Sequence, residues 1–255
     1  MKALTPPLLR QSLQKLGYTW HHDGPNLIGI RTALTVPDLF NDLLVCCWQQ
    51  PAMPPGLGLQ QQQEFLASWL YTGKDGKPIR ADGVPGPNTT FALAQLAATV
   101  GTDRMKTWII TTTPGNFYLH QPLSKLGCAV LVPGQYLDAY QLGLHQNKAT
   151  HPALVQTGGK VRAYRDNDRD FYAEETKVVE EGLFGINIHR ANVAGATPRI
   201  ANWSAGCQVF QRKSDHDELL LLCGHYRAGC HNCYTYTPIP CCASASWLRR
   251  RAFLY

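Results

Sequence analysis

The chain has 255 residues, 44% of them hydrophobic and 16% charged, which is ordinary for a soluble globular protein with one large domain or two smaller ones. No run of about 18 apolar residues occurs, so a membrane-spanning helix is excluded and we expect no membrane partner. The formal net charge is +6, but the basic residues are scattered apart from the arginines at 249–251, and we expect no nucleic-acid partner.

The first ten residues carry a positive charge but lack the continuous apolar segment of a secretory signal peptide. We therefore expect synthesis in the cytoplasm without a signal peptide. The nine cysteines are expected to be reduced there, and their odd number would leave one unpaired in any case. No feature of the sequence indicates an oligomeric state.

Residues 1–50 predict one helix followed by two strands. Leucines recur at helical spacing from residue 8 to residue 16, and Gly17 is a suitable helix end. The apolar runs 26–31 and 42–48 are typical of buried strands. We assign this segment to the sheet of the main domain, although the helix could instead belong to a binding unit of its own.

Residues 56–101 predict a small helical module. Segment 59–70 is a helix former with one apolar face, and a second helix begins at Pro87 with Phe91, Leu93 and Leu96 as its buried face. The connecting Asp-Gly-x-x-Gly-x-x-Thr pattern, residues 82–89, resembles the turn of the peptidoglycan-binding repeat. The resemblance implies a wall-binding module, and a purely structural helical hairpin is the alternative. If the preceding strands belong to the main sheet, the module is an insertion into that sheet.

Residues 105–240 read mainly as strands, which indicates a β-sandwich with small helical additions and an α+β fold overall. The expected strands are 107–112, 129–132, 140–145, 153–156, 161–164 and 185–189. One helix is expected at 215–222, with Ser214 as its cap. Residues 241–255 are expected to form a basic C-terminal tail.

A possible nucleophile lies near the end of this domain. His189 closes an apolar run and is followed, after fourteen intervening residues, by Ser204-Ala205-Gly206-Cys207. An imidazole can remove the proton of a thiol and stabilise the thiolate, so Cys207 would react below the usual pH range of cysteine. The backbone N–H groups of Gly206 and Cys207 are candidates for stabilising an oxyanion. The alternative is that Cys207 is a small buried apolar residue.

These residues resemble the signature of the L,D-transpeptidase (YkuD-type) catalytic domain, a histidine followed at about this interval by Ser/Thr-His-Gly-Cys. The segment Thr-Thr-Thr-Pro-Gly-Asn-Phe-Tyr, residues 111–118, resembles the family's Thr-Pro-x-Gly-x-Phe element and also precedes the histidine. The resemblance covers residues 105–237. The chain departs from the family at Ala205, where a second histidine is usual, and at Gln208-Val209.

The resemblance implies a YkuD-like β-sandwich and a cysteine enzyme that acts on L,D-linked stem peptides of peptidoglycan. Cys207 would attack the peptide carbonyl and His189 would carry the proton, with the imidazole oriented by the carbonyl of Arg190 or a nearby group. Ser204 and Gly206 complete the candidate catalytic segment. A thioacyl intermediate would form, and either hydrolysis or transpeptidation would follow. No cofactor or metal is implied, and peptidoglycan is the expected partner.

His145 and Tyr136 are the candidate substrate-binding residues. His145 and His151 flank a turn between two predicted strands, so one of them can line the cleft and compensate for the histidine missing at position 205. Alternatively, both histidines lie exposed at strand ends.

Two patterns resemble metal sites and fail as such. Residues 166–170 begin like a calcium loop, but Phe171 and Lys177 stand where glycine and glutamate are required. Near the C-terminus Cys230 and Cys233 form a Cys-x-x-Cys pair, whereas Cys241 and Cys242 lack this spacing, so we expect no zinc.

A wall enzyme without a signal peptide needs another route to the wall. Release as a phage lysis enzyme, incorporation into a phage tail, or delivery as an effector of a secretion machine each fits. The rival class is a non-enzymatic wall-binding or phage tail protein that keeps the fold with a weakened site, a reading motivated by Ala205.

Overall fold

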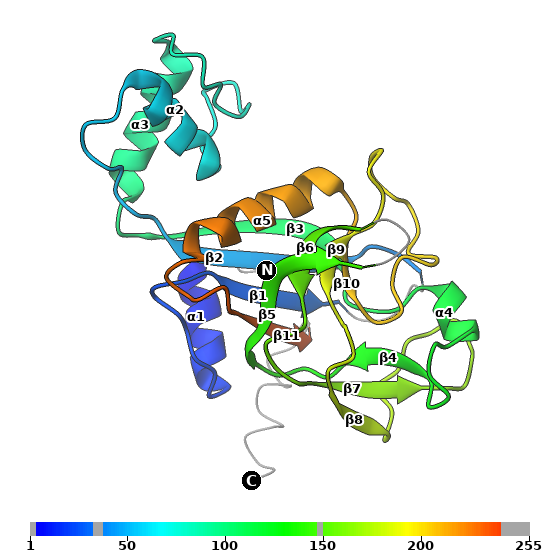
Figure 1. Cartoon of the computed structure of the whole chain (residues 1–255). Helices are drawn as coiled ribbons and strands as arrows, with labels where there is room; N and C mark the ends of the chain where they lie inside the picture. The colour runs from blue at the N-terminus through cyan, green and yellow to red at the C-terminus, as the bar shows by residue number, and fades with distance from the viewer. Residues whose placement is uncertain (1–3, 33–37, 147–149, 241–255) are drawn as a thin grey trace.

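Strands dominate the computed structural model, which describes residues 4–32, 38–146 and 150–240 (Figure 1). Within these residues, eight strands form a closed barrel and three form a separate small sheet. In barrel order the eight are β1 (Asn26–Arg31), β11 (Tyr234–Pro240), β5 (Tyr136–His145), β6 (His151–Val155), β9 (Ile188–Arg190), β10 (Gln208–Phe210), β3 (Asp103–Thr111) and β2 (Asp42–Gln49). The small sheet contains β4 (Cys128–Leu131), β7 (Val161–Asp166) and β8 (Val179–Gly182). With five helices among the described residues, the fold is α+β and rich in strands, as expected.

The barrel closes through β1, which pairs antiparallel with β2 and parallel with β11. Every residue of β1 is buried, because both of its edges are paired and both of its faces are covered. We expected a sandwich of two sheets. The eight strands instead form a continuous ring, since β1 joins what would otherwise be two free edges.

Helix α1 (Pro6–Lys15) covers one face of β1 and β2. Leu9 and Leu13 pack there against Ile28 and Val45. Gly17 follows the helix with a φ of +75°, a left-handed conformation that favours glycine, so the expected helix end is confirmed.

Helices α2 (Leu59–Ser68) and α3 (Pro87–Thr99) form the module, which lies between β2 and β3 and projects from one end of the barrel (Figure 1). The two ends of this insertion meet, because the Gly101 N–H donates to the Gln50 carbonyl at 2.8 Å. Helix α3 begins at Pro87 as expected. The predicted buried face of α3 was partly wrong. Phe91 is 38% exposed, because helical spacing places Thr89, Ala92 and Leu96 on the inner side.

Helix α5 (Lys213–Tyr226) packs Leu219, Leu222 and Cys223 into the largest hydrophobic core, which also contains barrel residues. The expected helix is present but begins earlier than predicted. Arg212 is its N-cap residue, so Ser214 lies inside the first turn and the predicted cap was wrong.

The other expected strands are present with shifted bounds. The largest shift is at 185–189, where the strand begins only at Ile188, because Gly185 has a φ of +69°, a left-handed conformation that interrupts extended backbone. The sequence pattern missed β8, β10 and the short helix α4 (Asn116–His120). Each has at most five residues, too few for a clear periodic signal.

Candidate active site

The two candidate catalytic residues are brought together by neighbouring strands. His189 lies in β9 and pairs with Val209 of the parallel strand β10, and Cys207 immediately precedes β10. Both side chains line one cleft of about 320 Å³. Cys207 and His189 therefore border the same solvent-accessible space, and the thiol donates to the Gly185 carbonyl rather than to the imidazole.

The two sequence elements that resembled the family signature are also in contact. The Gly115 N–H donates to the carbonyl of Ser204 at 2.9 Å. A Cβ atom at Gly115 would lie 2.1 Å from the carbonyl oxygen of Ala201, so only glycine allows this approach. The Thr-Pro-Gly segment thus supports the loop that precedes the nucleophile, and Tyr118, at its end, lines the cleft.

His189 is held as a neutral base. It is 3% exposed, and its Nδ1 lies 2.8 Å from the carbonyl oxygen of Arg190. A carbonyl only accepts, so Nδ1 carries the hydrogen and Nε2 keeps the lone pair. Burial, aided by the neighbouring His145, lowers the pKa of His189 to about 3. The carbonyl of Arg190 orients the ring as expected, while the Arg190 guanidinium donates to Ala191 instead.

Cys207 is held as a neutral thiol. Its side chain is half-buried, and its Sγ donates to the Gly185 carbonyl at 3.5 Å. Burial raises the pKa of Cys207 to about 11, and a backbone hydrogen bond from Asn187 opposes this shift. We expected a thiol that ionises more readily than usual. These pKa shifts favour the opposite resting state, a thiol and an imidazole that are both uncharged.

Ser204 and Gly206 shape the turn that presents the sulfur. The Ser204 hydroxyl donates to the Cys207 carbonyl at 2.8 Å and accepts from the Gly206 N–H at 3.1 Å. Gly206 has a φ of +129°, and a Cβ there would lie 2.6 Å from the Ala129 carbonyl oxygen. The expected role of the Gly206 N–H at an oxyanion was therefore wrong, since this group is already engaged. The Cys207 N–H has no acceptor among the described residues and remains a candidate donor.

Four histidines form a cluster that includes the candidate base. The ring of His145, from β5, stacks on His189 with centroids 4.1 Å apart, and its Nδ1 accepts from the Asn187 side-chain amide at 2.9 Å. His151 lies 5.3 Å from His145, and His216 of α5 lies 6.4 Å from His151. His145 lines the cleft, which supports the first of the two alternatives for this residue. No sequence pattern indicated His216, because only the packing of α5 brings it here.

Tyr136 lies outside the cleft. Its ring is 9% exposed, and its hydroxyl donates to the carbonyl of Val132 at 2.7 Å and also contacts that of Arg162. Burial raises the pKa of Tyr136 to about 12, so the hydroxyl stays protonated. The expected contact with substrate was wrong, and the residue instead ties the start of β5 to β7.

Sequence reasoning missed several side chains that line the cleft. Arg165 comes from β7, Phe184 precedes Gly185, and Trp203 precedes Ser204. They lie on three separate segments, none of which carries a motif. Their proximity depends on how the small sheet packs against the barrel, which no local pattern reports.

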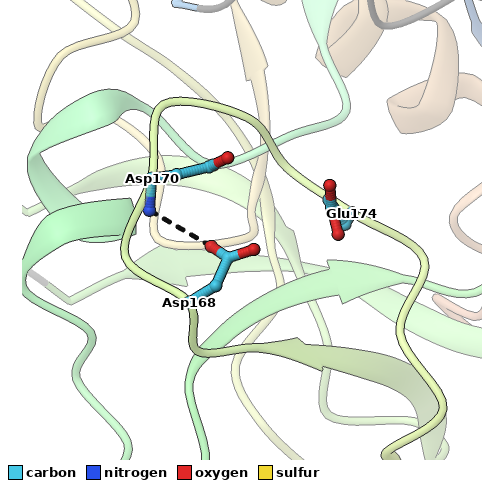
Figure 2. A group of neighbouring side chains, drawn as sticks. All are labelled: Asp168, Asp170 and Glu174. Atoms are coloured by element: carbon cyan, nitrogen blue, oxygen red, sulfur yellow. Dashed lines mark hydrogen bonds between the residues drawn. The ribbon is translucent and has the colours of Figure 1, made fainter.

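One group of three carboxylates converges among the described residues, on the loop between β7 and β8. Figure 2 shows Asp168, Asp170 and Glu174, with the Asp170 N–H donating to Asp168 at 3.1 Å. All three are exposed, and such groups are common without an ion. Cys230 and Cys233 belong to no such group, and Cys241 and Cys242 lie outside the described residues.

In the described part of the chain, each helix is too short or too polar to cross a bilayer. Neither the models of known protein families nor the curated proteins match this sequence, and no solved structure matches its fold.

Proposed function

We propose that the protein is a peptidoglycan-modifying cysteine enzyme that acts on L,D-linked stem peptides through a thioacyl intermediate. The carrying observation is that Cys207 and His189 line one cleft, with Nδ1 of His189 bonded to the Arg190 carbonyl. This bond leaves Nε2 as the basic nitrogen of the pair. A thiol and an oriented base that border one cleft support acyl transfer through cysteine, in which the imidazole takes the proton of the thiol.

The uncharged resting pair determines how the reaction starts. Because the pKa of the thiol is raised and that of the imidazole lowered, the proton moves to Nε2 as the sulfur attacks the carbonyl carbon. The carbonyl oxygen becomes an oxyanion, to which the Cys207 N–H, which has no acceptor within the described ranges, would donate. Collapse breaks the C–N bond, and the leaving amine takes the proton from His189.

The thioester then reacts with a second nucleophile. An acceptor amine or water gives up its proton to His189 as it attacks, and Cys207 leaves as the thiol. The amine route is transpeptidation, and the water route is carboxypeptidase or endopeptidase action. The cleft geometry supports thiol acylation of either kind.

The substrate class rests on the resemblance to the L,D-transpeptidase family. Two separated sequence elements carry that resemblance, and their contact at Gly115 and Ser204 supports it. The helical module adds support, because Gly83 has the positive φ, +70°, of a glycine-dependent turn just before α3. We further propose that this module binds the wall and that the protein reaches it from the cytoplasm through a phage or secretion route.

The test compares the purified protein with Cys207→Ala on isolated peptidoglycan, with the released muropeptides identified by mass. We expect new products that are lost in the variant. Loss of a D-amino acid from the stem would indicate a carboxypeptidase, and an exchanged terminal residue would indicate transpeptidation. Identical profiles for the two proteins would refute the enzyme proposal.

The raised pKa of Cys207 favours one alternative, a non-enzymatic wall-binding or phage tail protein with a weakened site. Such a protein would sediment with insoluble peptidoglycan and release nothing from it. Sedimentation of both proteins, measured beside the muropeptide masses, separates the two functions.

A further inference from the structure

Arg165 is a nearly buried cation with unused hydrogen-bond donors. Its side chain is 9% exposed, its Nε donates to Glu180 of β8, and its guanidinium lies 4.6 Å above the ring of Phe184. The two terminal nitrogens, which carry four N–H donors, have no acceptor among the described residues. Both nitrogens nevertheless reach solvent. Neither belongs to the described side-chain atoms that are buried without a hydrogen-bond partner.

The position of Arg165 is tied to that of the nucleophile. Arg165 pairs with Ala129 across the β4–β7 ladder, and Ala129 packs against Gly206, the residue before Cys207. Directly opposed residues in such a ladder lie about 5 Å apart. Arg165 and Cys207 both line the cleft of about 320 Å³, which is at the small end for ligand sites.

The cleft also has a one-sided charge. No carboxylate is among its described lining residues, and Arg165 is the only lining side chain with a full charge, since burial and neighbouring histidines favour the neutral forms of His145 and His189. Glu180 offsets part of this charge from outside the lining but contacts only Nε. A guanidinium with free terminal nitrogens binds a carboxylate through two parallel hydrogen bonds.

We propose that Arg165 is the binding site for a carboxylate of the substrate, next to the carbonyl that Cys207 attacks. This proposal rests on the function proposed above and names its acyl donor as an anionic peptide. Both the terminal carboxylate of a stem peptide and a side-chain carboxylate have this chemistry.

The test uses alkylation of Cys207 and needs no peptidoglycan. Iodoacetate and iodoacetamide have nearly the same shape, both form an S–C bond with loss of iodide, and only iodoacetate carries a carboxylate. Rates are followed by mass for the Cys207 peptide, and the iodoacetate-to-iodoacetamide ratio is compared with that of N-acetylcysteine amide. We expect the ratio at Cys207 to exceed the reference about tenfold, the effect of one charge-assisted hydrogen bond.

The variants identify the source of that preference. Arg165→Gln should lower the ratio about tenfold, mainly through the iodoacetate rate. Arg162→Gln is the matched control, because Arg162 lies on the same strand, is exposed, and does not line the cleft. Arg165→Lys keeps the charge without the planar fork and should give an intermediate ratio. Misfolding would be recognised by faster labelling of buried Cys46 and Cys223.

A ratio that is unchanged in Arg165→Gln, with the buried cysteines still protected, would overturn the proposal. The result is separable from the function proposed above. An Arg165-dependent ratio without muropeptide products would support the carboxylate site and refute the enzyme proposal. Cys207-dependent products without an Arg165-dependent ratio would support the enzyme proposal and refute the carboxylate site.

A second measurement distinguishes the two carboxylates. Stem tetrapeptides ending in D-alanine are titrated calorimetrically into Cys207→Ala, either unmodified or amidated at the C-terminus or at the D-glutamate. Amidation of the bound carboxylate should cost about tenfold in affinity. In Cys207→Ala/Arg165→Gln that cost should disappear. Equal costs of amidation with and without Arg165 would contradict the assignment.

Discussion

Cys207 and His189 are both uncharged in the resting protein at neutral pH. Burial is the dominant cause in each case, because it penalises the thiolate and the imidazolium alike. His145 adds to the effect, since its ring lies 4.1 Å from that of His189 and a second positive charge would be repelled. The site therefore keeps a base that remains unprotonated from neutral pH down to about pH 3.

This proton state predicts the pH dependence of Cys207 labelling by iodoacetamide. With a thiol pKa of about 11, the alkylation rate should rise steeply from pH 8 to pH 10. The alkylation rate of an ordinary cysteine, with a pKa of about 8.5, levels off above that pH. The rate at Cys207 is measured by mass, with N-acetylcysteine amide as the reference thiol. A plateau at or below pH 8 would instead indicate a preformed thiolate–imidazolium pair.

At the residue scale the sequence was informative where the chemistry is local. The spacing of His189 and Cys207 and the role of the Arg190 carbonyl followed from a short segment. His189 and Cys207 both line the cleft, and the Arg190 carbonyl is bonded to Nδ1 of His189. Arg165 and His216 could not be found this way, because each comes from an element whose packing sets its position. The prediction that Tyr136 contacts substrate was wrong for the same reason, since a sequence pattern does not indicate which side of a strand faces the cleft.

At the scale of elements, the helical module depends on one buried amide. Gln63 of α2 is 1% exposed. Its Oε1 accepts from the Gly83 N–H at 2.8 Å, and its Nε2 contacts the Val84 carbonyl at 3.0 Å and the Thr89 hydroxyl at 3.1 Å. A single side chain thus joins α2, the turn and the first residues of α3.

Gln63→Ala should destabilise the module by about 1–3 kcal/mol, because it leaves buried polar groups without partners. Hydrogen exchange followed by mass should show faster exchange in α2, α3 and the turn between them, with little change in the barrel strands. Gln60→Ala is the control on the same helix, since Gln60 is exposed and should change stability by no more than about 0.5 kcal/mol. Equal effects of the two substitutions would contradict the role of Gln63.

Long, strongly patterned elements were predictable, and their partners were not. The apolar runs of β1 and β2 and the helices of the module follow from local spacing. Barrel closure depends on the pairing of Leu27 with Tyr236, and no local pattern in either segment identifies the other as its partner. The β10 strand was missed because three residues, Gln208–Phe210, carry no period that could be recognised.

At the scale of the molecule, the module is an insertion into the hairpin formed by β2 and β3. Gln50 and Gly101 are hydrogen-bonded to each other, so the chain leaves β2 and re-enters β3 at nearly the same point. The module is not independent of the barrel, however. Trp69 stacks on His225 of α5 at 4.1 Å, and Arg104 of β3 donates to the Trp69 carbonyl at 2.7 Å.

Replacing residues 51–100 with Asn-Gly, a favoured two-residue hairpin turn, should keep the barrel folded. The melting temperature should fall, because the hydrophobic core that includes Leu66 also includes barrel residues. Thermal unfolding and circular dichroism measure both effects, and sedimentation with insoluble peptidoglycan should be lost. An unfolded product would show that the module is part of the core, and retained sedimentation would place wall binding on the barrel.

The parallel contact between β1 and β11 also has a consequence for biosynthesis. On the ribosome, the first strand emerges about 200 residues before its partner, so one hydrogen-bonding edge stays open during most of translation. Native closure therefore has to follow the emergence of β11, and such long-range pairing is intrinsically slow. A nascent chain of this kind is a natural client for a chaperone that shields unpaired strands.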